Sequence, residues 1–191
     1  MIAQAVALVL TAVFDLFILA ALVRFWMQVF RAPSRNPIAQ FSMALTDFAV
    51  KPVRRVVPGL WGMDLATLTI AWLTECVLIL LVVAFAGRFA SLGGTALVGI
   101  GLIGLLEVTK IALWMVILLQ FMLFVVSFAN PHSPYMPLLN AMNRPFARRI
   151  QKILPPIGNI DLSPMVVVLL CSVLLNFILP WLAGQIRVGL M

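Results

Sequence analysis

The chain has 191 residues, of which 64% are hydrophobic and only 10% carry a charge. A soluble domain has about a quarter of its residues charged, so this composition excludes an ordinary soluble fold and indicates a chain surrounded mostly by lipid. The formal net charge of +7 comes largely from loops between apolar stretches, which is typical of membrane orientation; no base-reading element accompanies it, so we expect no nucleic-acid partner.

Four apolar stretches are long enough to cross a bilayer, which takes about 20 residues in a helix. The first has no basic start and continues well past the length of a signal-peptide core, so it predicts a retained membrane helix. The predicted fold class is an all-α membrane protein with four transmembrane helices. The predicted spans cover residues 2–30, 65–86, 95–129 and 165–186.

A long polar loop follows the first span. In it Ile38, Phe41, Leu45 and Phe48 recur at helical spacing with polar residues between them, which predicts a short amphipathic helix on the membrane surface. Pro52 is expected to end this helix because proline removes a backbone donor. We expect a corresponding helix in the long loop after the third span.

Cap signals mark the spans that follow the two loops. Asp64 is placed to cap the second span, and Asp161 or Ser163 to cap the fourth, with Pro164 at its first helical position. Pro180 is expected to kink or end the fourth span.

Both long loops gather cations, and the positive-inside rule therefore places them in the cytoplasm. Four spans then put both termini outside. The cations have two interpretations that stay open: attraction to anionic lipid headgroups, worth about 1 kcal/mol per cation near the surface, or a docking face for a membrane or cytoplasmic protein. This basic loop motif comprises Lys51, Arg54, Arg55, Arg144, Arg148, Arg149 and Lys152.

The two halves of the chain superpose as span, cationic loop and span, which predicts two parallel repeats over residues 1–94 and 95–191. Asn36 and Asp64 in the first half match Asn130 and Asp161 in the second, with three more residues between them in the second. The residues of the repeat motif are Asn36, Pro37, Pro58, Asp64, Asn130, Pro131, Pro155, Pro156, Gly158, Asp161, Ser163 and Pro164.

The tandem unit of Asn-Pro, then Arg-Arg-x-x-Pro, then Pro-Pro-Ile-Gly-x-x-Asp-Leu-Ser-Pro resembles the YggT (YlmG) family over nearly the whole chain. The second loop carries the fuller match, whereas Gly59 replaces the second proline in the first loop. The resemblance implies a multi-pass protein of the bacterial inner membrane, with periplasmic termini in the orientation given above. It also implies links to osmotic and potassium adaptation, to cell division and to assembly of membrane complexes, but no agreed biochemical activity.

Ionisable residues inside a membrane are costly and usually face the bundle interior. In the repeat register Asp15 and Lys110 lie at similar depth, and Glu107 is three residues before Lys110, where it competes for it. Arg24 is placed to meet Glu75 or to reach the headgroups. Two interpretations stay open: these charges fasten the repeats together, which we favour because they come in neutralising sets, or they line a pathway for ions or protons.

No motif for catalysis, a cofactor or a metal is visible, because His132 is the single histidine and no phosphate-binding glycine motif occurs. Cys76 and Cys171 are interpreted as buried apolar residues. Thr95 and Gly99 form a small-xxx-small pair that suits close helix packing, within the chain or in a homo-oligomer. We predict a non-enzymatic scaffold or assembly factor with a protein partner; the alternative is a component of potassium uptake or osmotic adaptation.

Overall fold

The computed structural model describes the backbone of residues 2–33, 36–59, 63–87, 94–130, 132–153 and 163–190. Part of the predicted repeat motif lies outside these ranges, namely Pro131, Pro155, Pro156, Gly158 and Asp161.

All the regular elements of the described chain are helices. They are α1 (Ile2–Val29), α2 (Pro37–Val53), α3 (Leu65–Phe85), α4 (Ala96–Ala129), α5 (Met136–Gln151), α6 (Ser163–Val173), a π-helical turn (Leu174–Ile178) and α7 (Leu179–Leu190). Four helical segments are long and apolar enough to cross a membrane: α1, α3, α4 and the continuous run from α6 through α7. The all-α fold class with four candidate spans is therefore confirmed, and the starts of the four helical runs differ from prediction by no more than two residues.

We expected Pro180 to kink or end the fourth span, but the span does not end there. The helix continues to Leu190, and a π-helical turn occupies Leu174–Ile178, ending two residues before the proline. Proline cannot donate to the carbonyl four residues earlier, and a π turn is a local widening of the helix that rearranges this bonding. The irregularity therefore appears as a π turn inside a continuous helix.

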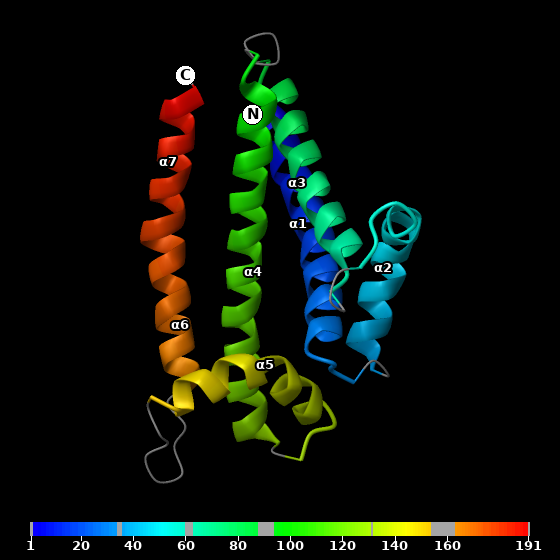
Figure 1. Ribbon diagram of the computed structural model, residues 1–191, viewed down its shortest axis with the longest axis vertical. Helices are drawn as coiled ribbons and strands as arrows, with labels where there is room; N and C mark the ends of the chain where they lie inside the picture. Colours follow the sequence, from blue (N-terminus) through cyan, green and yellow to red (C-terminus); the bar gives the residue numbers. More distant parts are fainter. Residues whose placement is uncertain are drawn as a thin grey trace.

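The spans form an open row with α4 at its centre (Figure 1). On one side α4 packs against α3 and α1, and on the other against α6 and α7. The helices α2 and α5 both lie toward the end of the molecule at which α1 and α4 finish, and the marked chain termini lie toward the other end (Figure 1). Because α6 and α7 pack mainly on α4 and α5, the row leaves broad apolar faces uncovered.

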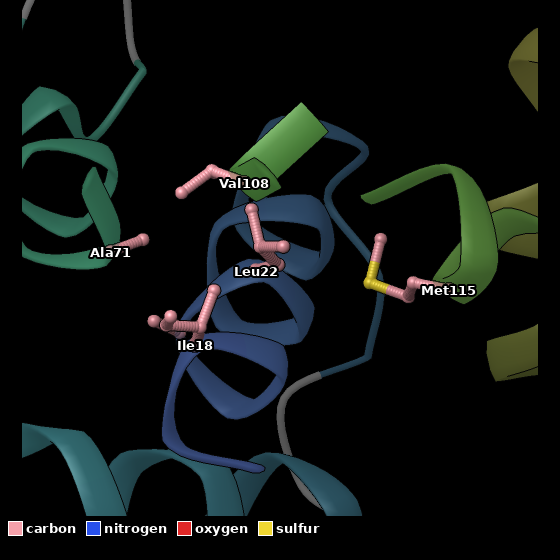
Figure 2. Packing of buried hydrophobic residues seen from close by; sticks show 6 residues of the cluster. Ile18, Leu22, Ala71, Val108 and Met115 are labelled. Atoms are coloured by element: carbon pink, nitrogen blue, oxygen red, sulfur yellow. The ribbon is translucent and has the colours of Figure 1, made fainter. Parts of the chain in front are cut away.

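Three buried clusters hold the row together. The first joins α1, α3 and α4 through Ile18, Leu22, Ala71, Val108 and Met115 (Figure 2). The other two lie around α5 and around α6.

Trp26 of α1 packs against all three clusters. Its ring stacks on Phe146 of α5 with 5.7 Å between the ring centroids, and its Nε1 donates a hydrogen bond to the Met142 carbonyl at 3.3 Å. Since Trp26 belongs to the first half and its α5 partners to the second, this side chain fastens the halves together.

Most of the large apolar side chains of α2 are exposed, although the Phe48 ring also contacts Phe17 of α1, with 5.7 Å between the ring centroids. Phe41 and Phe48 are exposed, whereas Ser42, Thr46 and Val50 are buried. The predicted helix is present, but its small and polar face makes the protein contact and its apolar face points outward. Pro52 lies within its last turn, so the helix ends one residue later than predicted.

The helix α5 shows the opposite arrangement. Leu138, Leu139 and Met142 are buried and pack in the cluster shared with α1 and α4, whereas Arg144 and Arg148 are exposed. The two loop helices therefore differ in what they present to the surroundings: α2 an apolar face, α5 a cationic one.

The helices α3 and α4 pack closely at Gly104. A Cβ atom built on this glycine would lie 2.9 Å from the Cys76 Sγ atom, which is shorter than real contacts of this kind. Four residues before Gly104 the Ile100 carbonyl accepts from Cys76 Sγ at 3.9 Å. Close packing of a small residue on α4 thus occurs within the chain at Gly104, whereas the sequence pointed to Thr95 and Gly99.

Candidate functional site

Four charged side chains from three spans interact with one another, and we name them the charge quartet: Asp15 of α1, Glu75 of α3, and Glu107 and Lys110 of α4. The Lys110 Nζ atom lies 2.9 Å from Glu107 Oε2, as their spacing of three residues suggests. Asp15 interacts electrostatically with Glu107 and Lys110, and Glu75 with all three. Three carboxyl groups thus share one cation, so the quartet is not the neutral set that the sequence suggested.

The members of the quartet differ in exposure. Glu75 is only 5% exposed, and its Oε2 atom has no hydrogen-bond partner among the described residues. The side chains of Glu107 and Lys110 are 38% and 51% exposed. A buried polar atom without a partner is costly, and so is an ion pair that faces lipid.

Arg24 does not meet Glu75, so this part of the prediction is wrong. Its Nη1 atom donates to Thr46 Oγ1 at 2.8 Å and to Asp47 Oδ1 at 2.7 Å. Asp15, which interacts with Glu75, precedes Arg24 by nine residues on α1, about 13 Å along a helix. Arg24 therefore bonds to the polar face of α2 and not to Glu75 on α3.

Asp47 also binds Lys51, at 2.7 Å. The hydrogen bond from Lys51 is the main reason that the pKa of Asp47 lies below its usual value, and the bond from Arg24 adds to it. Asp47 therefore stays ionised and holds Arg24 in place at the α1–α2 contact.

The second half has its own polar link between a span and a loop helix. Gln120 of α4 donates through Nε2 to Asn143 Oδ1 of α5 at 2.8 Å, and both side chains are buried. This link resembles the Arg24–Thr46 bond of the first half. Sequence reasoning missed both, because the sequence does not show which polar residues of the loop helices face the spans.

Asp64 ties the end of α2 to the start of α3. It occupies the N-cap position of α3, pairs with Arg54, and accepts from Thr67 Oγ1 at 2.6 Å. Burial alone would raise the pKa of Asp64, but the hydrogen bonds from Arg54 and Thr67 outweigh it and leave the pKa below the usual 3.8. The predicted cap residue thus acts through two side chains.

Asn36 and Asn130, which match in the repeat motif, make different contacts. Asn36 caps the start of α2, where its side chain accepts from the Ala39 amide at 2.9 Å, with Pro37 as the first helical residue. Asn130 instead follows the end of α4 and accepts from the His132 amide at 3.1 Å. The matched asparagines therefore differ in their contacts, because α5 begins six residues after Asn130, whereas α2 begins directly after Asn36.

Among the other predicted residues, Ser163 is the first residue of α6, and Pro164 lies in its first turn. Arg149 and Trp26 both line one apolar groove. Four further predicted residues are exposed: Lys51, Arg55, Pro58 and Lys152.

The end of α1 carries an unusual residue, Arg31. The Ala32 amide bonds to the Met27 carbonyl at 2.9 Å and the Arg31 amide to the Gln28 carbonyl at 3.2 Å, which is the helix ending usually completed by glycine. Arg31 adopts φ of 49°, a left-handed conformation that costs a residue with a Cβ atom roughly 1 kcal/mol or more.

Two cavities meet at Arg31. One, of about 340 Å³, lies between α1 and α2 and is lined by Arg24, Arg31 and Arg54. The other, of about 280 Å³, is lined by Arg31 with Arg144 and Arg148 of α5. The cations of the two loops thus gather on both sides of the end of α1. Within the described chain, no three His, Cys, Asp or Glu side chains lie together as metal ligands would.

Comparison with known proteins agrees with the two-part architecture. The family model CCB3/YggT matches the chain twice, over residues 3–85 and 100–182. The chain is 31% identical to "Uncharacterized protein YggT" of Escherichia coli over 86% of its length and 84% of that protein. It is 30% identical to "Uncharacterized protein in proC 3'region" of Vibrio alginolyticus over 85% of its length and 87% of that protein.

A Haemophilus influenzae protein is 27% identical over 93% of both chains, and no solved structure matches. Two matched segments, each containing a span, a loop helix and a second span, establish the tandem repeat. The chain therefore belongs to the CCB3/YggT family.

Proposed function

We propose that this protein is a non-enzymatic membrane scaffold that gathers partner proteins for assembly of a membrane complex. The observation that carries the proposal is the exposed Glu107–Lys110 ion pair on α4, the central span of an open row. Charged residues within membrane spans normally face protein or a water-filled cavity. A partner helix seated over this pair would remove it from lipid.

The pair belongs to one exposed stripe of α4. Residues 7, 11 and 14 positions after Glu107 return to the same helix face, and these are Trp114, Leu118 and Phe121, all exposed. The stripe thus combines an ion pair with large apolar side chains over about 21 Å. Polar groups that hydrogen-bond between helices, together with close packing, are what hold membrane helices together.

The loop helices support the same proposal from the other end of the molecule. The cationic face of α5 suits an acidic partner or anionic headgroups. We propose that both loops face the cytoplasm of a bacterium by the positive-inside rule, with the protein in the inner membrane and its termini in the periplasm.

The test is site-specific photocrosslinking in intact cells. A photoreactive residue at Trp114, which is 57% exposed, should capture a discrete protein. Val98 is a matched control, since it is 61% exposed on the opposite face of the same helix and should capture lipid. Changing Glu107 and Lys110 to glutamine should remove the Trp114 adduct while the protein still inserts. Adducts that are the same at both positions would argue against the scaffold.

A second candidate, a component of potassium uptake or osmotic adaptation, is favoured by one observation: the buried Glu75 carboxyl oxygen without a partner among the described residues. Such a group can take part in moving an ion or a proton. Purified protein in liposomes distinguishes the two functions. The scaffold predicts no potassium flux and a lower yield of folded Glu75→Gln protein; flux that Glu75→Gln abolishes without loss of folding would favour the pathway.

A further inference from the structure

We propose that the cavity between α1 and α2 binds the phosphate of an anionic phospholipid. Its volume is about 340 Å³, and three arginines line it: Arg24 and Arg31 from α1 and the adjoining turn, and Arg54 from the end of α2. Guanidinium groups are suited to phosphate because their planar donors match its oxygens in pairs. Gln28 and Ser42 add neutral polar groups to the lining.

The three arginines keep donors available for a ligand. Arg24 donates only through Nη1, to Thr46 and Asp47, and Arg54 donates only through Nη2, to Asp64. Among the described residues, no acceptor takes the remaining donors of either side chain, and Arg31 forms no ion pair.

The charge around the cavity is positive even after these pairs are counted. Among the described residues, the carboxylates of Asp47 and Asp64 alone balance the four cations Arg24, Arg31, Lys51 and Arg54, and Arg24, Lys51 and Arg54 are bound to them. The Arg24 side chain is only 10% exposed, so it is held in place and partly shielded from water. A phosphate would supply the negative charge that this site lacks.

Arg31 contributes independent support. It occupies a left-handed position that glycine would occupy without strain, yet its side chain lines the cavity. Strain retained at a residue that faces a cavity points to a role for its side chain in that cavity.

The lining favours a lipid over a free phosphate ion. Besides its arginines, the cavity is walled by apolar side chains, including Met27, Ala39 and Met43. Met43 is also 37% exposed, so part of this apolar wall is open to the surroundings. A phospholipid can place its phosphate among the arginines and its acyl chains along this apolar surface, whereas an inorganic ion gains nothing from it.

The experiment measures binding of a short-chain phosphatidylglycerol to the full-length protein in neutral detergent, by native mass spectrometry and titration. The test variant is Arg31→Gly, which removes the cation and suits the left-handed backbone, so its melting temperature should not fall. The control is Lys152→Gln, which removes one exposed cation of the second loop. We expect Arg31→Gly to weaken binding about tenfold or more, since a lost charge-assisted bond has about this effect, and Lys152→Gln to change it less than about twofold.

Phosphatidylcholine of the same chain length and inorganic phosphate complete the test. The proposal requires that phosphatidylcholine bind more weakly than phosphatidylglycerol, and that inorganic phosphate at equal concentration fail to displace the lipid. It is overturned if the two variants weaken binding equally, which would indicate diffuse attraction to a basic surface. It is also overturned if phosphatidylcholine binds as well, or if the free ion displaces the lipid.

Discussion

Replacing Gly104 by alanine tests how closely α3 and α4 are packed. The added Cβ atom would lie 2.9 Å from Cys76 Sγ, and its next neighbours, the Cys76 amide nitrogen and Trp72 Cδ1, would each lie at 3.7 Å. The clash therefore involves one atom of one side chain. Overpacking of this kind costs about 1–3 kcal/mol, against which the better helix propensity of alanine returns about 1 kcal/mol.

The cost can be isolated with two matched controls and a double mutant. Gly184→Ala places its Cβ in open space and Gly101→Ala meets Trp72 Cζ2 at 3.4 Å, an ordinary contact, so both should be neutral or slightly stabilising. Gly104→Ala should be less stable than Gly184→Ala by about 1–3 kcal/mol. Adding Cys76→Ala removes the clashing atom, so the double mutant should recover most of this difference as a coupling energy.

The assay is reversible unfolding in mixed micelles of detergent and dodecyl sulfate, followed by circular dichroism. The packing of α3 on α4 would be refuted if Gly104→Ala were as stable as Gly184→Ala. It would equally be refuted if the effects of Cys76→Ala and Gly104→Ala simply added.

Three further predictions use the same unfolding assay. Trp26→Ala should lower the free energy of unfolding by about 3–5 kcal/mol because it empties the junction of three clusters. Trp26→Phe keeps a ring there and should cost less, but about 1 kcal/mol of its cost should come from the lost hydrogen bond to Met142. Equal costs of Trp26→Ala and Trp26→Phe would contradict the role of Trp26 at this junction. Asn143→Leu should cost about 1–3 kcal/mol by stranding the Gln120 amide, and adding Gln120→Met should restore much of it; strictly additive losses would contradict this link. Because the pKa of Asp64 lies below its usual value of 3.8, its contribution to stability is complete above about pH 4 and is lost as pH falls further, through the lowered pKa. Asp64→Asn should be less stable at neutral pH and should flatten this dependence, and an unchanged slope would contradict the assignment.

The sequence predicted what depends on local pattern. The four spans follow from the length of apolar runs, and the Glu107–Lys110 pair follows from spacing along one helix. The doubled architecture could also be read from the sequence, because each half carries its own loop and spans.

The orientation of α2 could not be read from the same pattern. In water, the apolar face of an amphipathic helix turns toward the protein, but beside a bilayer lipid offers an equally apolar surface. Phe41 and Phe48 thus face outward, and Thr46 is free to meet Arg24. The Arg24–Glu75 pairing was predicted from depth along the helices alone, which does not show that Thr46 and Asp47 of α2 lie within reach of Arg24.

Contacts between distant residues were equally hidden. Nothing in the sequence distinguishes Trp26 from the other tryptophans, and its role depends on α5 crossing the end of α1 and α4. The strain at Arg31 likewise appears only in the backbone, because a left-handed helix end is signalled in a sequence by glycine and this one carries arginine.

The measurement that tests the parallel duplication most directly is cysteine accessibility across the membrane. Single cysteines are introduced at Arg54 and at Arg149, in a protein whose Cys76 and Cys171 are replaced by alanine, and are labelled with a membrane-impermeant thiol reagent. Two parallel repeats predict that both positions react in inverted vesicles and that neither reacts in right-side-out vesicles. Reaction of the two positions from opposite sides would contradict the arrangement of spans and loops described here.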